Sequence, residues 1–586
     1  MWSGLGMLDA SRGQICPRED RIGWRGRGRK SREEVAWHKR LAWLAICVPK
    51  RCSMADRDII IGIDAGTSVI KAVAFDLSGR QIAAAAVPNR YDSGPNGAAT
   101  QNMDRTWADC ASALRSLGER VDGLARRTAA LAVTAQGDGT WLVGQGDRPV
   151  GDAWLWLDAR AAETTRRLAG HGRDAARFRA TGTALNTCQQ GAQMAHMDRH
   201  CPELLDRAEV ALHCKDWLYL TLTGVRATDP SEASFTFGDF RTRSYSDLVI
   251  EALELRGRSH LLPPILDGSR DTHPLSNAAA EATGLLAGTP VSLGYVDMVM
   301  TALGAGVHTG TPGAACSTIG STGVHMRAVR DEDVTLNGRS GYVICLPAEG
   351  MVTQVQTNMA ATLNIDWALR VAADLMSETG HPHDYADLVA RIDGWLARSE
   401  PGALLYQPYV SEAGERGPMV NANARAGFIG LSAGHRFPDM MRAVVESLGM
   451  AARDCYGAMG ELPRELRLTG GAARSGALRG ILAASVGAPV RVSAREEAGA
   501  AGCAMMAAVA IGAYPDMESC VAEWVTPLLG EAEAPDPALQ TTYADLYPAY
   551  AEAREALEPV WDRLADHRDR RTTPEIDAPR TAQGGS

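Results

Sequence analysis

Lysine is scarce in this chain of 586 residues: it occurs five times, and only Lys71 and Lys215 lie beyond residue 53. None of the five stands in a Gly-x-x-x-x-Gly-Lys loop followed by Ser or Thr, so the sequence excludes the P-loop phosphate site. The Asp-Phe-Gly triplet of protein kinases is missing as well. Any phosphate chemistry must therefore use other residues.

Long apolar runs and paired cysteines are also absent. Nowhere do eighteen uncharged apolar residues follow one another, so no membrane-spanning helix and no membrane partner are predicted. The twelve cysteines form no Cys-x-x-Cys pair, which removes the common zinc and thioredoxin-like signatures. We expect small buried residues with reduced thiols, and hence a cytoplasmic protein. A hydrophobic content of 45% and the chain length fit two large globular domains.

Residues 1–53 differ from the rest in charge. They hold twelve Lys and Arg against five Asp and Glu, whereas the whole chain has a net charge of −10. The Arg-rich run 25–30 is compatible with a nucleic-acid arm, and the apolar run 41–48 with a signal-peptide core. The apolar run is short, however, and Pro49-Lys50-Arg51 follows it in place of a cleavage site. We expect a basic extension outside the fold, a true start at Met54 and no nucleic-acid partner.

Two short hairpins suggest an internal duplication. Strand-like runs at 59–63 and 69–75 flank a Gly-Thr-Ser turn, and runs at 314–319 and 324–328 flank a second turn of Gly, Ser and Thr. A helix at 108–124 and a strand at 130–134 follow the first hairpin. This alternation predicts an α/β fold.

The C-terminal third contains further expected elements. A strand at 466–468 runs into a glycine turn, and helices are expected at 476–486 and 497–510, the latter with small residues suited to close packing. Helix is also expected at 543–567, and the polar residues 568–586 read as a disordered tail.

Six motifs occur in an order that resembles the FGGY carbohydrate kinases. They are Ile63-Asp64-Ala65-Gly66-Thr67-Ser68, Gln136-Gly137-Asp138, Trp156-Leu157-Asp158-Ala159-Arg160, Gly294-Tyr295-Val296-Asp297, Gly320-Ser321-Thr322-Gly323 and Thr469-Gly470-Gly471-Ala472. The segments 406–418, 426–431 and 442–446 extend the match. The resemblance implies two actin-like (ribonuclease H-like) ATPase domains with a central interdomain cleft, which use ATP and Mg²⁺ to phosphorylate a small sugar or polyol.

The resemblance also implies domain boundaries. Residues 54–306 would form the N-terminal domain, with the substrate site, the first phosphate loop and the catalytic base. Residues 307–530 would form the C-terminal domain, with the second phosphate loop and the adenosine site. Residues 531–586 would form a C-terminal helix and the disordered tail.

Most of the implied site residues bind the nucleotide. The resemblance makes Asp64 the carboxylate that positions Mg²⁺. It assigns ATP and its phosphates to Gly66, Thr67, Ser68, Lys71, Gly320, Ser321, Thr322, Gly470, Gly471 and Ala472. Backbone N–H groups at such turns can cradle phosphate, although Gly and Ser in one hairpin are as often only a turn. For Lys71, a surface lysine on a strand is the alternative to a phosphate contact.

Asp297 matches the catalytic base, and Gln136, Asp138 and Trp156 match substrate contacts. The residue type and place of Asp297 also fit a plain helix N-cap, a role compatible with that of a base. Trp156 is by default a core residue.

Three departures from glycerol kinases put glycerol in doubt. Gly137, Cys188 and Met298 stand where those enzymes have arginine, tyrosine and an amide, which should leave a differently shaped, roomier pocket. Gln189 and Gln190 are either hydroxyl contacts or exposed loop residues.

A four-carbon polyol fits this pocket, and we expect erythritol as the acceptor, giving D-erythritol 1-phosphate (L-erythritol 4-phosphate). Xylulose, ribulose, glycerol or another polyol remains an alternative within the family. A non-catalytic nucleotide-binding sugar sensor is the alternative of another class, and the presence of both Asp64 and Asp297 opposes it. A homodimer is one arrangement open to such a protein.

Overall fold

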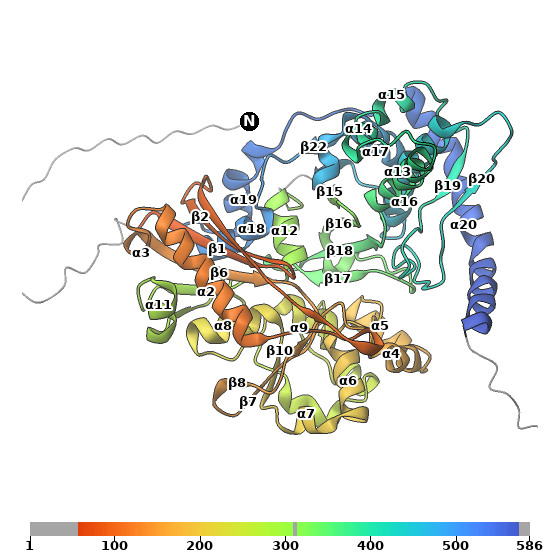
Figure 1. The fold of residues 1–586 in the computed structure, drawn as a ribbon. Helices are drawn as coiled ribbons and strands as arrows, with labels where there is room; N and C mark the ends of the chain where they lie inside the picture. The colour runs from red at the N-terminus through yellow and green to blue at the C-terminus, as the bar shows by residue number, and fades with distance from the viewer. Residues whose placement is uncertain (1–56, 309–312, 573–586) are drawn as a thin grey trace, which may run out of the picture. The chain divides into compact units, whose positions relative to one another are not determined.

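The computed structural model of the chain describes residues 57–308 and 313–572 (Figure 1). We call these two ranges the first half and the second half. The predictions for the basic extension and for the tail beyond residue 572 lie outside the described residues. Within the described ranges, no helix is both long enough and apolar enough to cross a membrane.

The first half is built on a six-stranded sheet with the order β13-β14-β6-β1-β2-β3. Its strands are β1 (Ile59–Ala65), β2 (Val69–Asp76), β3 (Gln81–Pro88), β6 (Thr128–Ala135), β13 (Thr272–Pro274) and β14 (Pro290–Leu293). Strands β1, β2 and β3 run antiparallel, whereas β6 pairs in parallel with both β1 and β14. The predicted first hairpin is confirmed as β1 and β2.

Helices cover both faces of this sheet, because its central strands are apolar on both sides. Ile59, Ile61 and Ile63 of β1 belong to one apolar cluster, and Ile60 belongs to another. Helices α2 (Met103–Arg120) and α8 (Cys214–Thr223) pack on one face, while α12 (Asp297–Ala305) and α18 (Ala498–Ala510) pack on the other (Figure 1). The helix predicted at 108–124 corresponds to α2, which starts five residues earlier, at Met103, and ends at Arg120.

The second half also has a six-stranded sheet, in the order β17-β18-β16-β15-β21-β22. Its strands are β15 (Ala314–Ile319), β16 (Gly323–Arg330), β17 (Tyr342–Cys345), β18 (Met351–Asn358), β21 (Glu465–Thr469) and β22 (Val490–Val492). The β15–β16 hairpin is antiparallel and β15 pairs in parallel with β21, as β1 does with β2 and β6. Five strands share one order in the two sheets, β14-β6-β1-β2-β3 and β22-β21-β15-β16-β18, which agrees with the duplication predicted from the two hairpins. The sixth strands, β13 and β17, lie at opposite edges.

Smaller elements lie between β6 and β14 in the sequence. They are β7 (Trp141–Gly144), α4 (Ala162–Ala169), α5 (Asp174–Thr181), α6 (Gln190–His200), α7 (Pro202–Asp206), β10 (Val210–Leu212), α9 (Pro230–Phe237), α10 (Asp247–Ala252) and α11 (Asn277–Thr283). Helix α9 contributes Phe235 to the cavity described below, and it also packs against β17 of the second half.

Helices α12 and α18 lie unusually close, because glycines face the partner backbone. A Cβ atom on Gly304 of α12 would stand 2.0 Å from the carbonyl oxygen of Ala498, and one on Gly502 of α18 would stand 2.0 Å from that of Met300. The small-residue helix predicted at 497–510 is confirmed, and it packs the second half onto the first.

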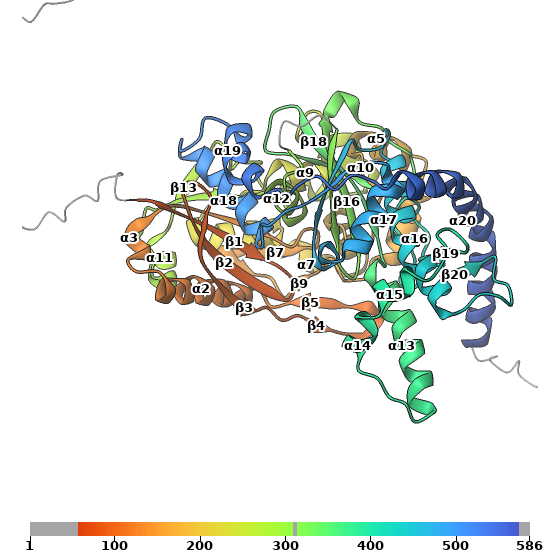
Figure 2. The same ribbon diagram turned by 90° about the horizontal axis from the view of Figure 1, so that it is seen from above.

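The second half contains seven further helices in the described residues. They are α13 (Thr362–Glu378), α14 (Tyr385–Val389), α15 (Ile392–Leu396), α16 (Phe437–Gly457), α17 (Gly476–Val486), α19 (Met517–Trp524) and α20 (Pro537–Thr572). In Figure 2, α13 and α14 lie beside each other at the margin of this half. Helix α20 starts earlier than predicted and reaches Thr572, so the expectation that the chain is disordered from Arg568 onward is wrong for residues 568–572.

Candidate active site

A cavity of about 260 Å³ brings together six of the predicted site residues and side chains of both halves. The predicted residues that line it are Thr67, Gln136, Asp138, Trp156 and Asp297 of the first half and Thr322 of the second hairpin. The cavity is smaller than the roughly 300–1,000 Å³ of pockets for drug-sized ligands, so it fits a small acceptor.

A chain of hydrogen bonds runs along one wall of this cavity. Trp156 Nε1 donates to Thr67 Oγ1 over 2.8 Å, and Thr67 Oγ1 donates to Gln136 Oε1 over 2.8 Å. Gln136 Nε2 in turn donates to Gln101 Oε1 over 2.7 Å. These hydrogen bonds join the tip of the first hairpin to two residues predicted to contact the acceptor, so the groups hold one another in place.

Asp297 is the first residue of α12, directly after the turn that follows β14. The N-cap position belongs to Val296, so the alternative interpretation of Asp297 as an N-cap is wrong; its Oδ1 accepts from the N–H of Met298 over 2.7 Å. Burial and the negative charge of Asp64 raise the pKa of Asp297 to about 7. A carboxylate with a pKa near the working pH is suited to accept a hydroxyl proton.

Asp138 is held in the left-handed region, with a φ of 55°, by the tight turn after Gly137. Its Oδ2 accepts from the Cys188 thiol over 3.3 Å, while its Oδ1 is buried without a hydrogen-bond partner. Burial raises the pKa of this carboxyl, and the Cys188 bond and nearby cations lower it. An unpartnered buried acceptor at a cavity is placed to bind a hydroxyl group.

Gly137, Cys188 and Met298 all line the cavity, as their matches to acceptor positions predict. A Cβ atom on Gly137 would lie 2.5 Å from Cγ2 of Val296. The space left by the missing side chain is therefore filled on this side by Val296, and Gly137 does not enlarge the pocket there.

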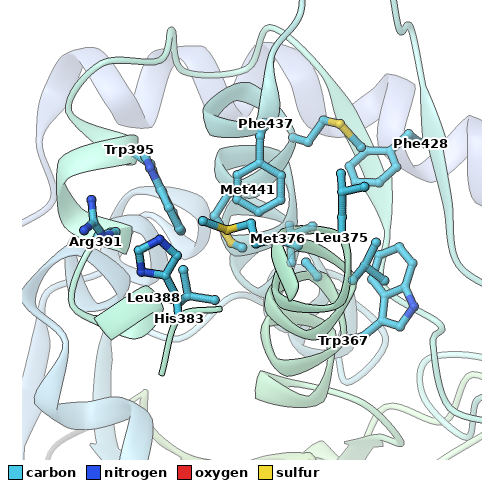
Figure 3. A pocket seen from close by; sticks show the side chains of 15 residues that line it. Trp367, Leu375, Met376, His383, Leu388, Arg391, Trp395, Phe428, Phe437 and Met441 are labelled. Carbon is cyan, nitrogen blue, oxygen red and sulfur yellow. The ribbon is translucent and has the colours of Figure 1, made fainter. Parts of the chain in front are cut away.

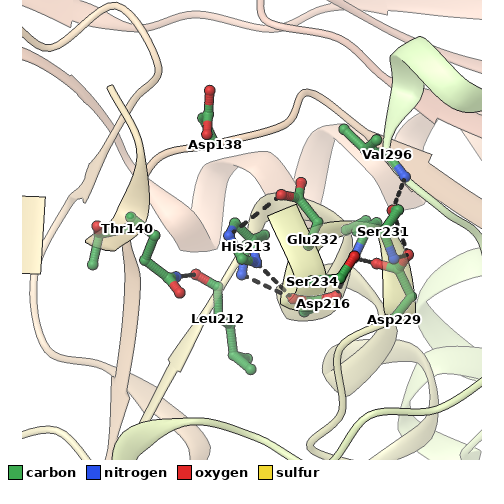
Figure 4. A network of polar contacts seen from close by, with 12 residues as sticks. Asp138, Thr140, Leu212, His213, Asp216, Asp229, Ser231, Glu232, Ser234 and Val296 are labelled. Carbon is green, nitrogen blue, oxygen red and sulfur yellow. Dashed lines mark hydrogen bonds and ion pairs between the residues drawn. The ribbon is translucent and has the colours of Figure 1, made fainter. Parts of the chain in front are cut away.

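A buried group of charges lies behind this wall (Figure 4). Lys215 Nζ contacts Asp216 over 2.5 Å and also pairs with Asp229, which accepts from the hydroxyl of Ser231. Ser231 Oγ accepts from the N–H of Val296 over 3.0 Å. The charged group therefore fixes the turn that carries the neighbouring Asp297.

His213 and Glu232 extend the same group toward Asp138 (Figure 4). His213 Nδ1 lies 3.2 Å from Asp216 Oδ2, and its Nε2 lies 3.5 Å from Glu232 Oε2. Burial raises the pKa of Glu232 to about 8, and Asp138 is among the charges that add to the shift. Because acids outnumber bases here, part of the group's stability depends on bound protons.

The first phosphate hairpin has an ordered tip. The N–H of Gly66 donates to the carbonyl of Val69 over 3.0 Å, and Asn89 ties both Gly66 and Ser68 by 2.9 Å and 2.8 Å bonds. Thr67 alone of the tip faces the cavity, whereas Ser68 is exposed.

The second hairpin tip and the predicted adenosine turn lie next to each other. The carbonyls of Gly320 and Ser321 accept from the N–H groups of Thr362 and Ala361. Gly470, with a φ of 90°, approaches β15 so closely that a Cβ atom would lie 2.6 Å from the carbonyl oxygen of Ile319. Gly471 and Ala472 follow in a short 3₁₀ turn before α17. The fold thus brings together two segments about 150 residues apart in sequence.

Asp64 stands near the end of β1, where its carboxylate faces the N-terminal turn of α18: a Cβ atom on Gly499 would lie 2.4 Å from Oδ2. Burial raises its pKa to about 6, against the opposing charge of Lys71. No group of three potential metal ligands occurs in residues 57–308 or 313–572. A single carboxylate fits Mg²⁺ that arrives with ATP, since this ion is typically held by one or two carboxylates and substrate phosphates.

Lys71 forms an ion pair with Glu497 over 2.7 Å, and its side chain is 38% exposed. It lies outside the cavity lining, as do Asp64, Ser68 and the three residues of the adenosine turn. Gln189 and Gln190 are buried and bind backbone groups, so the interpretation of exposed loop glutamines is wrong. The nine cysteines in the described ranges are free, and eight of them are buried, as expected.

Apart from Thr322, the residues that the second half contributes to the cavity were not predicted from the sequence. They include Tyr342, Asn358 and Arg416. Arg416 lies within the segment 406–418 that extends the family match, but nothing in its spacing marks it as a pocket residue.

A second cavity, of about 450 Å³, contains none of the predicted residues (Figure 3). It lies among α13, α14, α15 and α16, and Trp367, Leu375, Trp395 and Phe437 give it an apolar wall. Without a carboxylate or a phosphate-binding turn, it offers no phosphoryl-transfer chemistry.

Comparison with known proteins identifies the family of the chain. The model of the FGGY family of carbohydrate kinases matches residues 59–304 with its N-terminal domain and 315–511 with its C-terminal domain. The chain is 72% identical over 509 residues to the erythritol kinase of Brucella abortus (strain 2308). The aligned region covers 87% of this chain and 98% of that protein. It is 29% identical to the xylulose kinase of Escherichia coli (strain K12), over 86% and 99% of the two chains. The crystal structure of xylulose kinase from Rhodospirillum rubrum matches with a TM-score of 0.77 at 23% identity, over 86% and 100% of the chains.

The family matches, together with the two related sheets, define a sugar kinase with two actin-like ATPase domains. The two family-model matches extend over both halves of the fold. The chain belongs to the FGGY family of carbohydrate kinases, and it is an ATP-dependent enzyme.

Proposed function

We propose that this kinase phosphorylates a primary hydroxyl of erythritol. The observation that carries the choice of acceptor is the 72% identity to the Brucella abortus erythritol kinase over nearly the whole of that protein. The cavity is consistent with it, because it is small and combines carboxylates with hydrogen-bonding groups from both halves. The enzyme would act in the cytoplasm. Light scattering tests whether it forms a homodimer.

In the proposed reaction, Asp297 accepts the proton of the primary hydroxyl as its oxygen attacks the γ-phosphorus of ATP. The bond from that phosphorus to the bridging oxygen breaks, and ADP leaves. Asp138 and Trp156 position the acceptor, and Thr67 with the two hairpin tips holds the phosphates. Mg²⁺, held through Asp64, would neutralise negative charge on the phosphates when bound.

The nucleotide roles divide between the proposed domains 54–306 and 307–530. The first hairpin, with Gly66, Ser68 and Lys71, would approach the phosphates from one side. The second hairpin, with Gly320, Ser321 and Thr322, would approach from the other, and the turn Gly470-Gly471-Ala472 would hold the adenosine. Backbone amides at these turns supply the donors.

A coupled ADP-release assay over a panel of polyols and pentuloses tests the acceptor. We expect the highest kcat/KM with erythritol, and lower values with glycerol, xylulose and ribulose. Erythritol is meso, so a chiral site should phosphorylate one end only and give optically pure D-erythritol 1-phosphate (L-erythritol 4-phosphate). A preference for a pentulose, or a racemic product, would reject the proposal.

A further inference from the structure

Arg416 is the positively charged residue that the second half places in the acceptor cavity. It lines this cavity together with Asp138, Cys188 and Tyr342. Asp138, Cys188 and Tyr342 are among the groups whose charges raise the pKa of Arg416, against the effect of its burial. The guanidinium therefore stands beside acceptor residues of the first half.

The backbone around Arg416 is tied down. The buried Glu415 Oε1 accepts from the N–H groups of Met359 over 2.9 Å, of Arg416 over 2.8 Å and of Gly417 over 3.4 Å. Asn358 Nδ2 donates to the carbonyl of Gly417 over 2.8 Å. These bonds fasten the turn to the end of β18, so Arg416 projects from a fixed base.

Asp138 and Arg416 are close but not directly bonded. Arg416 is one of the cations that lower the pKa of Asp138, yet no hydrogen bond or ion pair joins the two side chains in the described part of the chain. Asp138 Oδ1 has no partner, although it is buried. A carboxylate accepts from hydroxyl protons and a guanidinium donates to hydroxyl oxygens, so a polyol between them would satisfy both.

We propose that Arg416 is an acceptor-binding residue that holds a secondary hydroxyl of the polyol against Asp138, so that the acceptor bridges the two halves of the enzyme. This inference rests on the proposed function for the class of acceptor. Because the second half also carries the proposed adenosine turn, an acceptor held by Arg416 favours the arrangement in which both halves contact the substrates. Acceptor and nucleotide then bind cooperatively, and the coupling is reciprocal.

The test compares Arg416→Gln and Arg416→Lys with Arg339→Gln, which changes an exposed arginine of the same half. Calorimetry gives the Kd of erythritol, and that of a non-hydrolysable ATP analogue with Mg²⁺, each alone and with the other ligand. We expect Arg416→Gln to weaken erythritol binding by about tenfold to a hundredfold, as for loss of hydrogen bonds to a charged group. The analogue alone should bind as in the wild type, and the gain in its affinity on adding erythritol should disappear.

Two results would overturn the proposal. One is an unchanged erythritol Kd in a folded Arg416→Gln protein. The other is an equal loss of analogue affinity with and without erythritol, which would place Arg416 on the nucleotide. Arg416→Lys keeps the charge but loses the planar fork, so it should recover only part of the affinity.

The two enantiomers of 1,2,4-butanetriol, each lacking one secondary hydroxyl of erythritol, locate the contact. The wild type should bind one of them at least tenfold more weakly than erythritol, while Arg416→Gln should bind that enantiomer and erythritol alike. Equal discrimination by both proteins would contradict the proposal. If the wild type prefers another polyol, the proposed acceptor is wrong. The same comparison of the wild type with Arg416→Gln is then made with that polyol and its deoxy analogues.

Discussion

Trp156 Nε1 lies 2.8 Å from Thr67 Oγ1, and this hydrogen bond links the proposed acceptor site to the first phosphate hairpin. The same Thr67 hydroxyl donates a second hydrogen bond, to Gln136 Oε1. One hydroxyl group of the phosphate hairpin therefore orients two of the proposed acceptor residues.

Replacing either partner of this bond should affect the acceptor more than the fold. Trp156→Phe removes the N–H donor and keeps an aromatic ring, and we expect kcat/KM for the acceptor to fall about two- to tenfold, the net value of one hydrogen bond. Thr67→Val leaves Trp156 Nε1 and Gln136 Oε1 without their partner and should cost more. Steady-state kinetics check both variants, with Trp107→Phe on α2 as the control. Equal kinetics in Thr67→Val and the wild type would show that the link has no catalytic role.

Asp297→Asn keeps the size of the side chain and its bond from Met298, but it cannot act as a base. We expect kcat to fall by about 10²–10⁴-fold, the usual value of general-base assistance. Nucleotide affinity should hardly change. Asp247→Asn is a matched control, because Asp247 also stands in the first turn of a helix and is exposed. Turnover near that of the wild type would remove Asp297 from the mechanism.

The same variant predicts a pH dependence of stability in the nucleotide-free protein. The pKa of Asp297 is about 7 in the folded state, against about 3.9 in an unfolded chain, so the folded state binds this proton more tightly. Its contribution to stability is present at low pH and is lost as the pH rises through 7. Asp297→Asn escapes this loss, so its melting temperature should rise relative to the wild type between pH 5 and 8. A difference that does not vary with pH would contradict the raised pKa.

The two lysines beyond residue 53 should behave in opposite ways. Lys215→Met leaves Asp216 and Asp229 buried without their cation, which should cost about 3–5 kcal/mol in the free energy of unfolding. Lys71→Met breaks a partly exposed pair with Glu497, worth about 0–1 kcal/mol.

Denaturant unfolding and the KM for ATP separate the two roles. We expect Lys71→Met to keep its stability while the KM for ATP rises, because Lys71 is a proposed phosphate contact. An unchanged KM would favour the interpretation of Lys71 as a surface lysine. A Lys215→Met protein as stable as the wild type would show that the buried charges are not coupled.

Close packing of α12 on α18 should tolerate no side chain at Gly304, since its Cβ would collide with the carbonyl oxygen of Ala498. We expect Gly304→Ala to lower the melting temperature and to disturb Asp297 at the start of the same helix. Gly118→Ala on α2 is the control: no atom lies within 4 Å of the added Cβ, and alanine favours a helix by about 1 kcal/mol, so stability should rise. Equal effects at both sites would contradict the packing argument.

The sequence by itself determined the local elements and the family. Both hairpins, the small-residue helix at 498–510 and the helix at 476–486 follow from turn residues and from periodicity, which depend on neighbours along the chain. The motifs around Asp64, Asp138, Trp156 and Asp297 were legible for the same reason, since each is a short run of adjacent residues. Helix ends were less accurate, as in α2 and α20, because end positions depend on packing.

Only the tertiary structure decided which side chains meet in the cavity. Arg416 and Asp138 are nearly 280 residues apart in sequence, and the packing of the two halves brings them to the same cavity. Val296 fills the space beside Gly137 because β14 lies next to β6. The side chains of Gln189 and Gln190 are buried because their amide groups donate to backbone carbonyls in the interior. Such contacts depend on long-range packing, in which residues distant in sequence set the environment of each side chain. A pattern of neighbouring residues does not predict these contacts.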